Sequence, residues 1–298
     1  MVEDDSVIAQ PVQDPRSACA APPHPSIVAG KPGSRGRPGA AADSVSLAPR
    51  EHGAYGQLAV PAVTAFAMGR PTLAACALAL AAVLVFLAHE PALVVLGRRG
   101  SRASRHAARA RRFVVGLGIG ALAAGALGLW LSPPARTLTL LPLALALALA
   151  VAVVRGVEKT LWGEILAASA LSGAALPIAL ASGVGATTAL LAWSAWCVSF
   201  AAVTWAVRLV VAHKRAPIHA ARRLAPLFGP ALLVATGLGV AGAARWSAAA
   251  ALPAVVVALV VASAPPDPRK LRRVGWALVA TSIVTAAVLA IGAHAAGT

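Results

Sequence analysis

The sequence predicts an all-α membrane protein, a bundle of about nine transmembrane helices with its N-terminus in the cytoplasm and its C-terminus outside. The first observation is composition: 59% of the 298 residues are hydrophobic and only 12% are charged, whereas soluble domains carry about 25% charged residues. The second is length, because successive apolar runs approach the roughly 20 residues that cross a hydrocarbon core of about 30 Å. The third is that Lys and Arg gather in alternate connections between these runs.

The chain divides into two predicted parts. Residues 1–48 contain Pro, Ser, Gly and scattered charges without apolar periodicity, a composition that cannot bury enough surface to order a chain. We therefore expect a disordered cytoplasmic tail, and not a cleavable signal peptide, since a basic start followed by an apolar core is missing. Residues 49–298 are predicted to form the polytopic transmembrane helical domain. Whether the tail has a role is left open.

Nine apolar runs provide the predicted spans. The first is short and contains Pro61, and Pro177 lies in the fifth; kinks at such prolines are tolerated where neighbouring helices or water satisfy the freed carbonyls. The predicted spans are 54–69, 72–88, 113–132, 137–154, 161–181, 187–211, 226–243, 247–264 and 274–295.

The distribution of basic residues predicts the topology. With nine spans, only Arg70, Arg136 and Arg245 of the 26 Lys and Arg residues fall on the side opposite the N-terminal tail. Cytoplasmic loops carry the excess of Lys and Arg, so the side that holds the tail is predicted to be cytoplasmic. Merging or splitting one interior span would abolish this segregation.

Two groups of polar residues flank the first helical hairpin. Glu51, His52 and Tyr55 lie at the entry to the first span, and His89 and Glu90 follow the second. Both groups would lie at the same cytoplasmic level, where imidazoles and carboxylates together bind a divalent metal or transfer a proton. The alternative is that they cap helix ends among lipid headgroups. We favour this alternative over a metal site and keep all five as tentative ligand-binding residues.

Glu164 and Arg208 are ionisable residues within predicted spans. A charged group inside the membrane is costly and is a functional-site hypothesis by default. Glu164 would either face the bundle interior or pair near the interface with Lys159 or Arg155. Arg208 would either extend to the headgroups, bind a phosphate or anionic headgroup, or pair with Glu164.

Two basic segments, 98–112 and 214–223, flank predicted spans. Such segments beside a membrane bind anionic lipid headgroups. Nucleic-acid binding would require aromatic side chains for stacking, and residues 98–112 contain none, so we expect no nucleic-acid partner. Trp193 and Trp196 near the outer end of the sixth span are interpreted as part of an aromatic interfacial belt.

Three short sequences resemble the YwiC-like family of bacterial membrane proteins. The residues that carry the resemblance are Pro49-Arg50-Glu51-His52-Gly53-Ala54-Tyr55, then Phe86-Leu87-Ala88-His89-Glu90-Pro91, then Lys270-Leu271-Arg272-Arg273-Val274-Gly275-Trp276. The resemblance covers about 49–296 and implies a multi-pass protein of the bacterial cytoplasmic (inner) membrane. It implies no activity, because none is assigned to the family.

Helix number and polar residues on one side are similar, more distantly, to the UbiA-type intramembrane prenyltransferases. That similarity implies a prenyl diphosphate held through Mg²⁺ by Asp-rich motifs after the second and sixth helices. Here the first loop offers His89 and Glu90, and no carboxylate lies between Arg208 and Arg223, whereas Mg²⁺ requires oxygen ligands. The sequence therefore predicts a carrier, or a lipid-binding or accessory protein, with a cytoplasm-facing site. The alternative is a UbiA-like enzyme, or a degenerate relative, acting on a lipid and requiring Mg²⁺.

Overall fold

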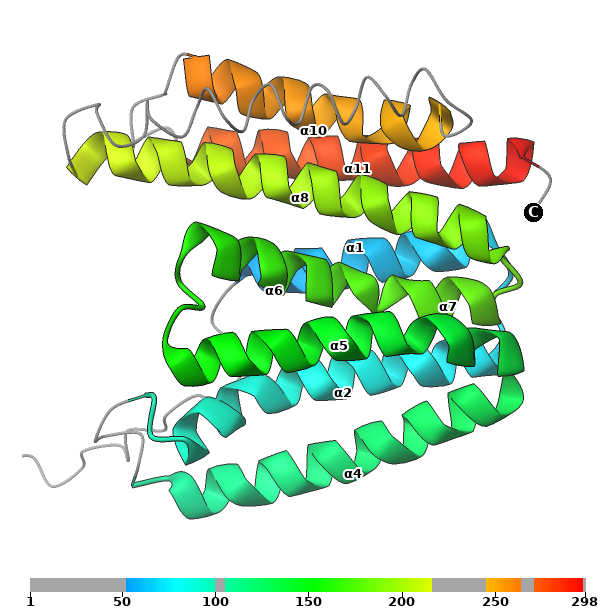
Figure 1. The fold of residues 1–298 in the computed structure, drawn as a ribbon, viewed down its shortest axis with the longest axis vertical. Coiled ribbons are helices and arrows are strands. Elements are labelled where there is room, and N and C mark those ends of the chain that lie inside the picture. Colours follow the sequence, from blue (N-terminus) through cyan, green and yellow to red (C-terminus); the bar gives the residue numbers. More distant parts are fainter. Residues whose placement is uncertain (1–51, 100–104, 216–244, 264–270, 297–298) are drawn as a thin grey trace, which may run out of the picture. The chain divides into compact units, whose positions relative to one another are not determined.

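The computed structural model describes residues 52–99, 105–215, 245–263 and 271–296, and this part of the chain is helical without any strand. The all-α prediction is confirmed. The tail 1–48 and the predicted seventh span, 226–243, lie outside the described residues. The helices, labelled in Figure 1, are α1 (His52–Met68), α2 (Leu73–Val95), α4 (Ala107–Leu131), α5 (Pro133–Arg155), α6 (Leu161–Gly173), α7 (Ala175–Ala181), α8 (Ala186–Arg215), α10 (Arg245–Ser263) and α11 (Leu271–Ala295).

Seven described segments are long and apolar enough to cross a membrane: α2, α4, α5, α6 with α7, α8, α10 and α11. The α1 helix has 17 residues, which lies at the short end of the usable range of about 17–25. The chain is thus a multi-pass integral membrane protein.

The predicted fifth span is not one continuous helix. It is interrupted at Ala174, whose N–H bonds to the carbonyl of Leu171 at 3.3 Å, between α6 and α7. Pro177 has no N–H to donate to the carbonyl of Gly173, one turn earlier, so the helical ladder is broken at this point. Together α6 and α7 form the most enclosed span, with 56% of its apolar window buried against 11% for α4.

Glycines bring α2 and α4 into close contact. A Cβ added at Gly128 would lie 2.6 Å from Cγ of Leu78, and one at Gly120 would lie 3.2 Å from Cδ1 of Leu84. Small residues allow such close approach between membrane helices, where dispersion contacts replace the hydrophobic effect as the main attraction. Most of the remaining surface of α4 is exposed, as expected for a helix facing lipid.

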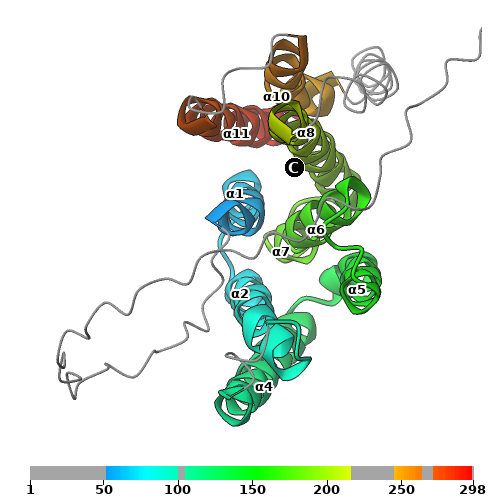
Figure 2. The same cartoon turned by 90° about the vertical axis from the view of Figure 1, so that its left-hand side faces the viewer.

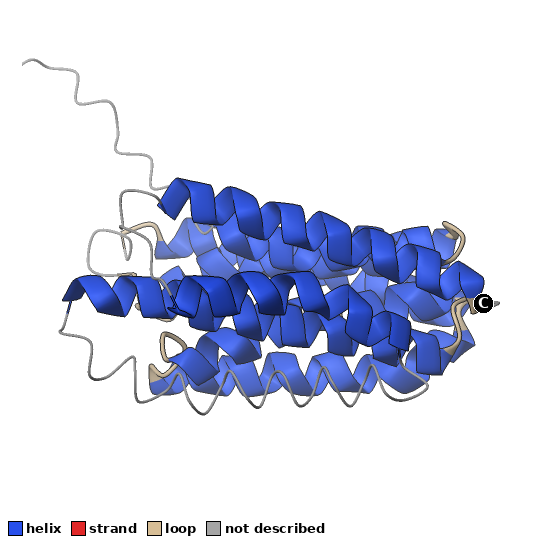
Figure 3. Ribbon diagram, turned by 90° about the horizontal axis from the view of Figure 1, so that it is seen from above, coloured by secondary structure: helices blue, strands red, loops and turns tan. Residues whose placement is uncertain are grey.

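The helices run side by side, so their connections gather at two ends of the bundle (Figures 1 and 3). We call the end near Arg98, Arg105, Arg155 and Lys159 the basic end; α2 and α5 finish there, and α4 and α6 begin. We call the other the opposite end, where α7 finishes and α8 begins.

The apolar core is divided unevenly between these ends. The main cluster lies in the half near the opposite end and joins residues such as Met68, Leu176, Trp196 and Leu289. A separate, smaller cluster in the basic half joins only α8, α10 and α11 among its buried members. These three helices form one group in Figure 2, on the far side of α1, α6 and α7 from α2 and α4.

Candidate functional site

A bidentate ion pair joins α6 to α8 near the basic end. Nε of Arg208 donates to Oε2 of Glu164 at 2.8 Å, and Nη2 donates to Oε1 at 2.5 Å. Nη2 also donates to the backbone carbonyl of Lys159. Two parallel N–H···O bonds of this kind fix orientation as well as supplying charge-assisted strength. Of the alternatives weighed for these residues, the structure shows the Glu164–Arg208 pair.

The local sequence places Glu164 by capping and by a tight turn. Gly156 ends α5 at a φ of +73°, and Thr160 caps α6 by accepting a hydrogen bond from the N–H of Gly163 at 3.1 Å. A Cβ at Gly163 would lie 2.4 Å from the carbonyl oxygen of Val157, so only glycine allows the turn to fold against α6. Glu164 therefore falls in the first helical turn, where a carboxylate is favoured by the helix dipole.

Both partners of the pair lie within apolar spans, yet neither is fully enclosed. The side chains of Arg208 and Glu164 are 37% and 42% exposed. An unpaired charge at the centre of a membrane helix costs about 2.5–3.5 kcal/mol on insertion scales, and this cost falls toward the helix end. Solvent screening at this depth weakens the attraction as well. The guanidinium is thus both paired and accessible.

Glu158, in the turn before α6, is a further polar group that the sequence analysis did not select as a candidate. Its Oε2 is buried and accepts no hydrogen bond from any residue that the structure describes. Its position in the sequence, one residue before Lys159 in the connection between two spans, could have identified it as a candidate. The turn and the start of α6 thus carry two carboxylates, one of which is paired with Arg208.

The residues of the first hairpin are engaged separately. Glu90 is buried, and its carboxylate accepts hydrogen bonds from Arg99, through Nε at 2.9 Å and through Nη2. Arg98 donates to the backbone carbonyl of Val154, which ties the end of α2 to the end of α5. These contacts identify Glu90 as part of a structural connection at the basic end.

The other hairpin candidates are only partly described. His89 is exposed, and the ring of Tyr55 packs edge-on against Phe86 with centroids 4.9 Å apart. Glu51 and the side chain of His52 lie outside the described residues. Among the residues described, no group of three or more His, Cys, Asp or Glu is arranged to hold a metal ion. The proposed meeting of both pairs stays a prediction.

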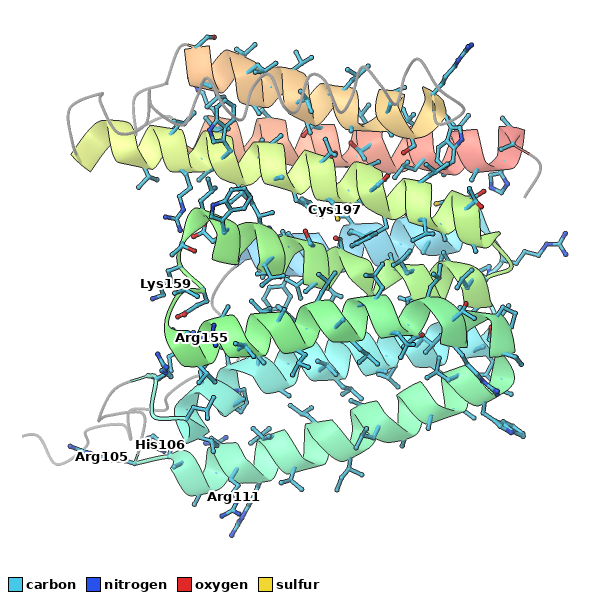
Figure 4. The ribbon with its side chains drawn as sticks, viewed as in Figure 1. Arg105, His106, Arg111, Arg155, Lys159 and Cys197 are labelled. Atoms are coloured by element: carbon cyan, nitrogen blue, oxygen red, sulfur yellow. The ribbon has the colours of Figure 1, made fainter. Side chains whose placement is uncertain are left out.

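Basic side chains collect at the same end as the ion pair (Figure 4). Arg105, His106 and Arg111, near the start of α4, lie at this end together with Arg155 and Lys159. The first turn of α4 holds no acidic residue, so no carboxylate of that turn offsets the positive end of the helix dipole. Segment 98–112 therefore presents strong positive charge in its described part. Most of segment 214–223 lies outside that part.

Of the two tryptophans expected in an interfacial belt, Trp196 is buried and Trp193 is half-buried. Trp196 is 1% exposed and stacks on Phe200 with centroids 5.3 Å apart, while Nε1 of Trp193 donates to the carbonyl of Ser169 at 3.3 Å. The belt interpretation is wrong for Trp196, because the side of α8 that carries it packs against α1 and α7. Hydropathy and position along the span do not reveal which side of a helix faces a neighbour.

The enclosed cavity beside Trp196 is too small for an organic ligand. Its volume of about 10 Å³, lined by residues that include Pro61, Thr64 and Trp193, suits roughly one water molecule. None of the predicted site residues line this cavity.

Comparison with known proteins gives a family for part of the chain. Residues 48–180 match the family model described as YwiC-like protein. This segment includes the first hairpin and Glu164, and it ends one residue before the end of α7. No curated protein and no solved structure matches the chain. Over residues 48–180, this membrane protein is therefore similar to the YwiC-like family.

Proposed function

We propose that the chain crosses the bacterial inner membrane nine times, with its N-terminus and its basic end in the cytoplasm. The seven described segments able to span a membrane and the short α1 support eight of these crossings. The apolar run 226–243 supplies the ninth. The distribution of Lys and Arg supports the orientation. With nine spans, only Arg70, Arg136 and Arg245 would lie on the side away from the cytoplasm.

We propose further that the protein binds an anionic amphiphile at its basic end, as a carrier or as a lipid-binding accessory protein. The observation that carries this proposal is the Glu164–Arg208 pair, a guanidinium held within apolar spans but still 37% exposed. A planar guanidinium with parallel N–H donors is suited to carboxylate and phosphate groups. An anionic headgroup reaching Arg208 would keep its hydrocarbon chain within the membrane.

The surrounding positive charge would favour the same class of ligand. The arginines of segment 98–112, and those of segment 214–223 in the sequence, flank spans at the basic end. Each Lys or Arg near an anionic membrane surface contributes about 1 kcal/mol of attraction. These residues would concentrate anionic headgroups close to Arg208 without selecting one of them. Tyr55 and His89, together with Glu51 and His52 in the sequence, are further candidate ligand-binding residues.

Prenyl transfer is the weaker candidate. A diphosphate enzyme of that type needs Mg²⁺ held by several carboxylate oxygens. Glu90 and Glu164, the described carboxylates among the candidate residues, are each engaged by an arginine. Metal-dependent release of pyrophosphate from a prenyl diphosphate by the purified protein would nevertheless establish this alternative.

The test is to identify the lipids that co-purify with the protein. Wild type and the Arg208→Gln variant are purified in parallel, and the extracted lipids are measured by mass spectrometry. The expected result is an anionic amphiphile enriched with wild type and reduced about tenfold in the variant, equivalent to about 1.4 kcal/mol. Arg136→Gln, which removes an exposed arginine at the opposite end, is the matched control and should retain the lipid. Identical lipid profiles for wild type and Arg208→Gln would overturn the proposal.

A further inference from the structure

The contacts that hold α6 differ in kind from those that hold α7. All seven residues of α7 are buried, and the helix belongs to the main core with Ala189, Ala192 and Trp196 of α8. Toward the basic end, by contrast, α8 turns its buried residues to α10 and α11. There α6 adds only the half-buried Leu161 to that smaller cluster. The polar link from Arg208 to Glu164 and Lys159 is thus a principal contact between α6 and α8 at the basic end.

The break at Ala174 lies between α6 and α7, the two helices whose contacts differ. Helix α7 is fixed by packing. Helix α6 joins it through Gly173 and Ala174, and the N–H of Ala174 bonds only to the nearby carbonyls of Leu171 and Ser172. The carbonyl of Gly173 has no helical donor because Pro177 follows four residues later. Loss of a ladder bond in mid-span is a recognised cause of sharp kinks. Helix α6 has contacts of its own near the break, because Ala168 belongs to the main core and the carbonyl of Ser169 accepts from Trp193 of α8. The break is therefore the point at which the first turns of α6 would change their angle to α7.

We propose that the Glu164–Arg208 pair is a displaceable latch. A phosphate-type anion that takes the guanidinium of Arg208 releases α6 from α8, and the basic end opens about the break at Ala174 while the main core stays closed. The inference rests on the proposed function, because it assigns to the same site the step by which its ligand enters.

The chemistry of Glu164 supplies the coupling between binding and opening. When an anion occupies the guanidinium, the carboxylate loses its charged partner and two hydrogen bonds. The part of the Glu164 side chain that is not exposed would then have no partner, which is costly, so water must reach it. The titratable groups on the turn before α6 and on the helices packed against it include Arg155 at the end of α5, Glu158 and Lys159 in the turn, Arg208 on α8 and Tyr55 on α1. Separation of α6 from α8 admits the water that replaces the lost bonds.

Distance measurements between spin labels test the latch. In a full-length background with the native cysteines replaced by alanine, one pair of labels is placed at Trp162 and Val211, on α6 and α8. A reference pair is placed at Arg70 and Thr187, across the opposite end; all four positions are exposed. The protein is reconstituted in phosphatidylcholine nanodiscs, alone, with dodecyl phosphate, or with inorganic phosphate.

Dodecyl phosphate is expected to lengthen the Trp162–Val211 distance by about 5 Å, the scale of a one-turn helix shift, and to leave the reference distance unchanged. A response to inorganic phosphate as well would assign a soluble phosphate ligand, and a response to dodecyl phosphate alone would assign an amphiphile. Glu164→Gln should be open without any ligand. The charge-swapped variant Glu164→Arg with Arg208→Glu should be closed, which separates loss of the latch from misfolding.

An unchanged Trp162–Val211 distance in both Glu164→Gln and wild type with dodecyl phosphate would overturn the latch. Equal movement of the reference pair would also overturn it, because the main core would then not be fixed. If anionic lipid co-purifies through Arg208 while this distance stays constant, the latch fails and the proposed function stands. If Glu164→Gln opens but dodecyl phosphate neither binds nor opens wild type, the pair is a mechanical contact, and the anion's role and the proposed function both fail.

Discussion

The opposite end and the basic end of this bundle are stabilised by different interactions. Near the opposite end, side chains from eight helices share one apolar cluster in which Leu176 and Ile178 are almost fully buried. At the basic end, individual polar contacts join the helices, among them Glu164 with Arg208 and Glu90 with Arg99. In a shared core, many other contacts maintain the helix packing when one contact is altered. An ion pair, by contrast, is lost completely when one partner is removed. The basic end is therefore the part of the molecule suited to change state.

The largest expected effect comes from placing a bulky side chain in the tight turn at the basic end. In Gly163→Val, the added Cβ would meet backbone carbonyl oxygens of Val157 and Glu158 at 2.4 and 2.6 Å, which cannot move without unfolding the turn. We expect a loss of about 3 kcal/mol in the free energy of unfolding, measured by thermal unfolding of detergent-solubilised protein. Gly118→Val is the matched control, because open space surrounds Gly118. Similar stability of the two variants would contradict the described turn.

The next effect tests the core near the opposite end. Leu176→Ala removes a side chain that is 1% exposed and should lower the free energy of unfolding by about 2 kcal/mol. This value is near the low end for buried leucines, because a membrane-unfolded state also keeps leucine in lipid and only packing is lost. Leu140→Ala, at a position 71% exposed, should have little effect in the same assay. Equal losses would mean that Leu176 is not packed in the shared core as described.

The smallest expected effect ranks the two ion pairs by double-mutant cycles in unfolding experiments. Glu90 is 10% exposed in its pair with Arg99, whereas Glu164 is 42% exposed in its pair with Arg208. Coupling of Glu90 to Arg99 should be about 1–2 kcal/mol and that of Glu164 to Arg208 about 0.5–1 kcal/mol. Added salt should weaken the second pair more. The reverse ranking would identify Glu90–Arg99 as the weaker connection and would argue against the assignment of the latch.

Hydropathy predicted most of the architecture, because a lipid environment demands long apolar helices with internally satisfied backbones. The limits of α8, predicted as 187–211 and observed as Ala186–Arg215, show how closely this works away from polar connections. The position of the break at Ala174 was not predicted from the sequence. Pro177 indicated a possible kink, but its position depends on which carbonyl loses its donor and on the neighbouring turn.

The site was predicted in part. An ionisable residue in an apolar run stands out by composition alone, which selected Glu164 and Arg208. Their pairing was one of several alternatives, because the sequence does not specify which sides of two helices face each other. The same ignorance of helix rotation led to the wrong placement of Trp196. It also left Glu158 outside the candidate residues, although it lies within six residues of Glu164.

The capping of α4 by Arg136 bears on how this protein enters its membrane. Nε of Arg136 donates to the carbonyl of Leu129 at 2.8 Å, so its charge rests against the negative end of a helix. In the proposed topology, each cation delivered to the outer surface moves against a potential worth about 2.3 kcal/mol per charge per 100 mV. The α4–α5 hairpin delivers one such cation, and α4 partly neutralises it once both helices have formed. The electrical work of inserting this hairpin is thus offset in part by the carbonyl end of α4.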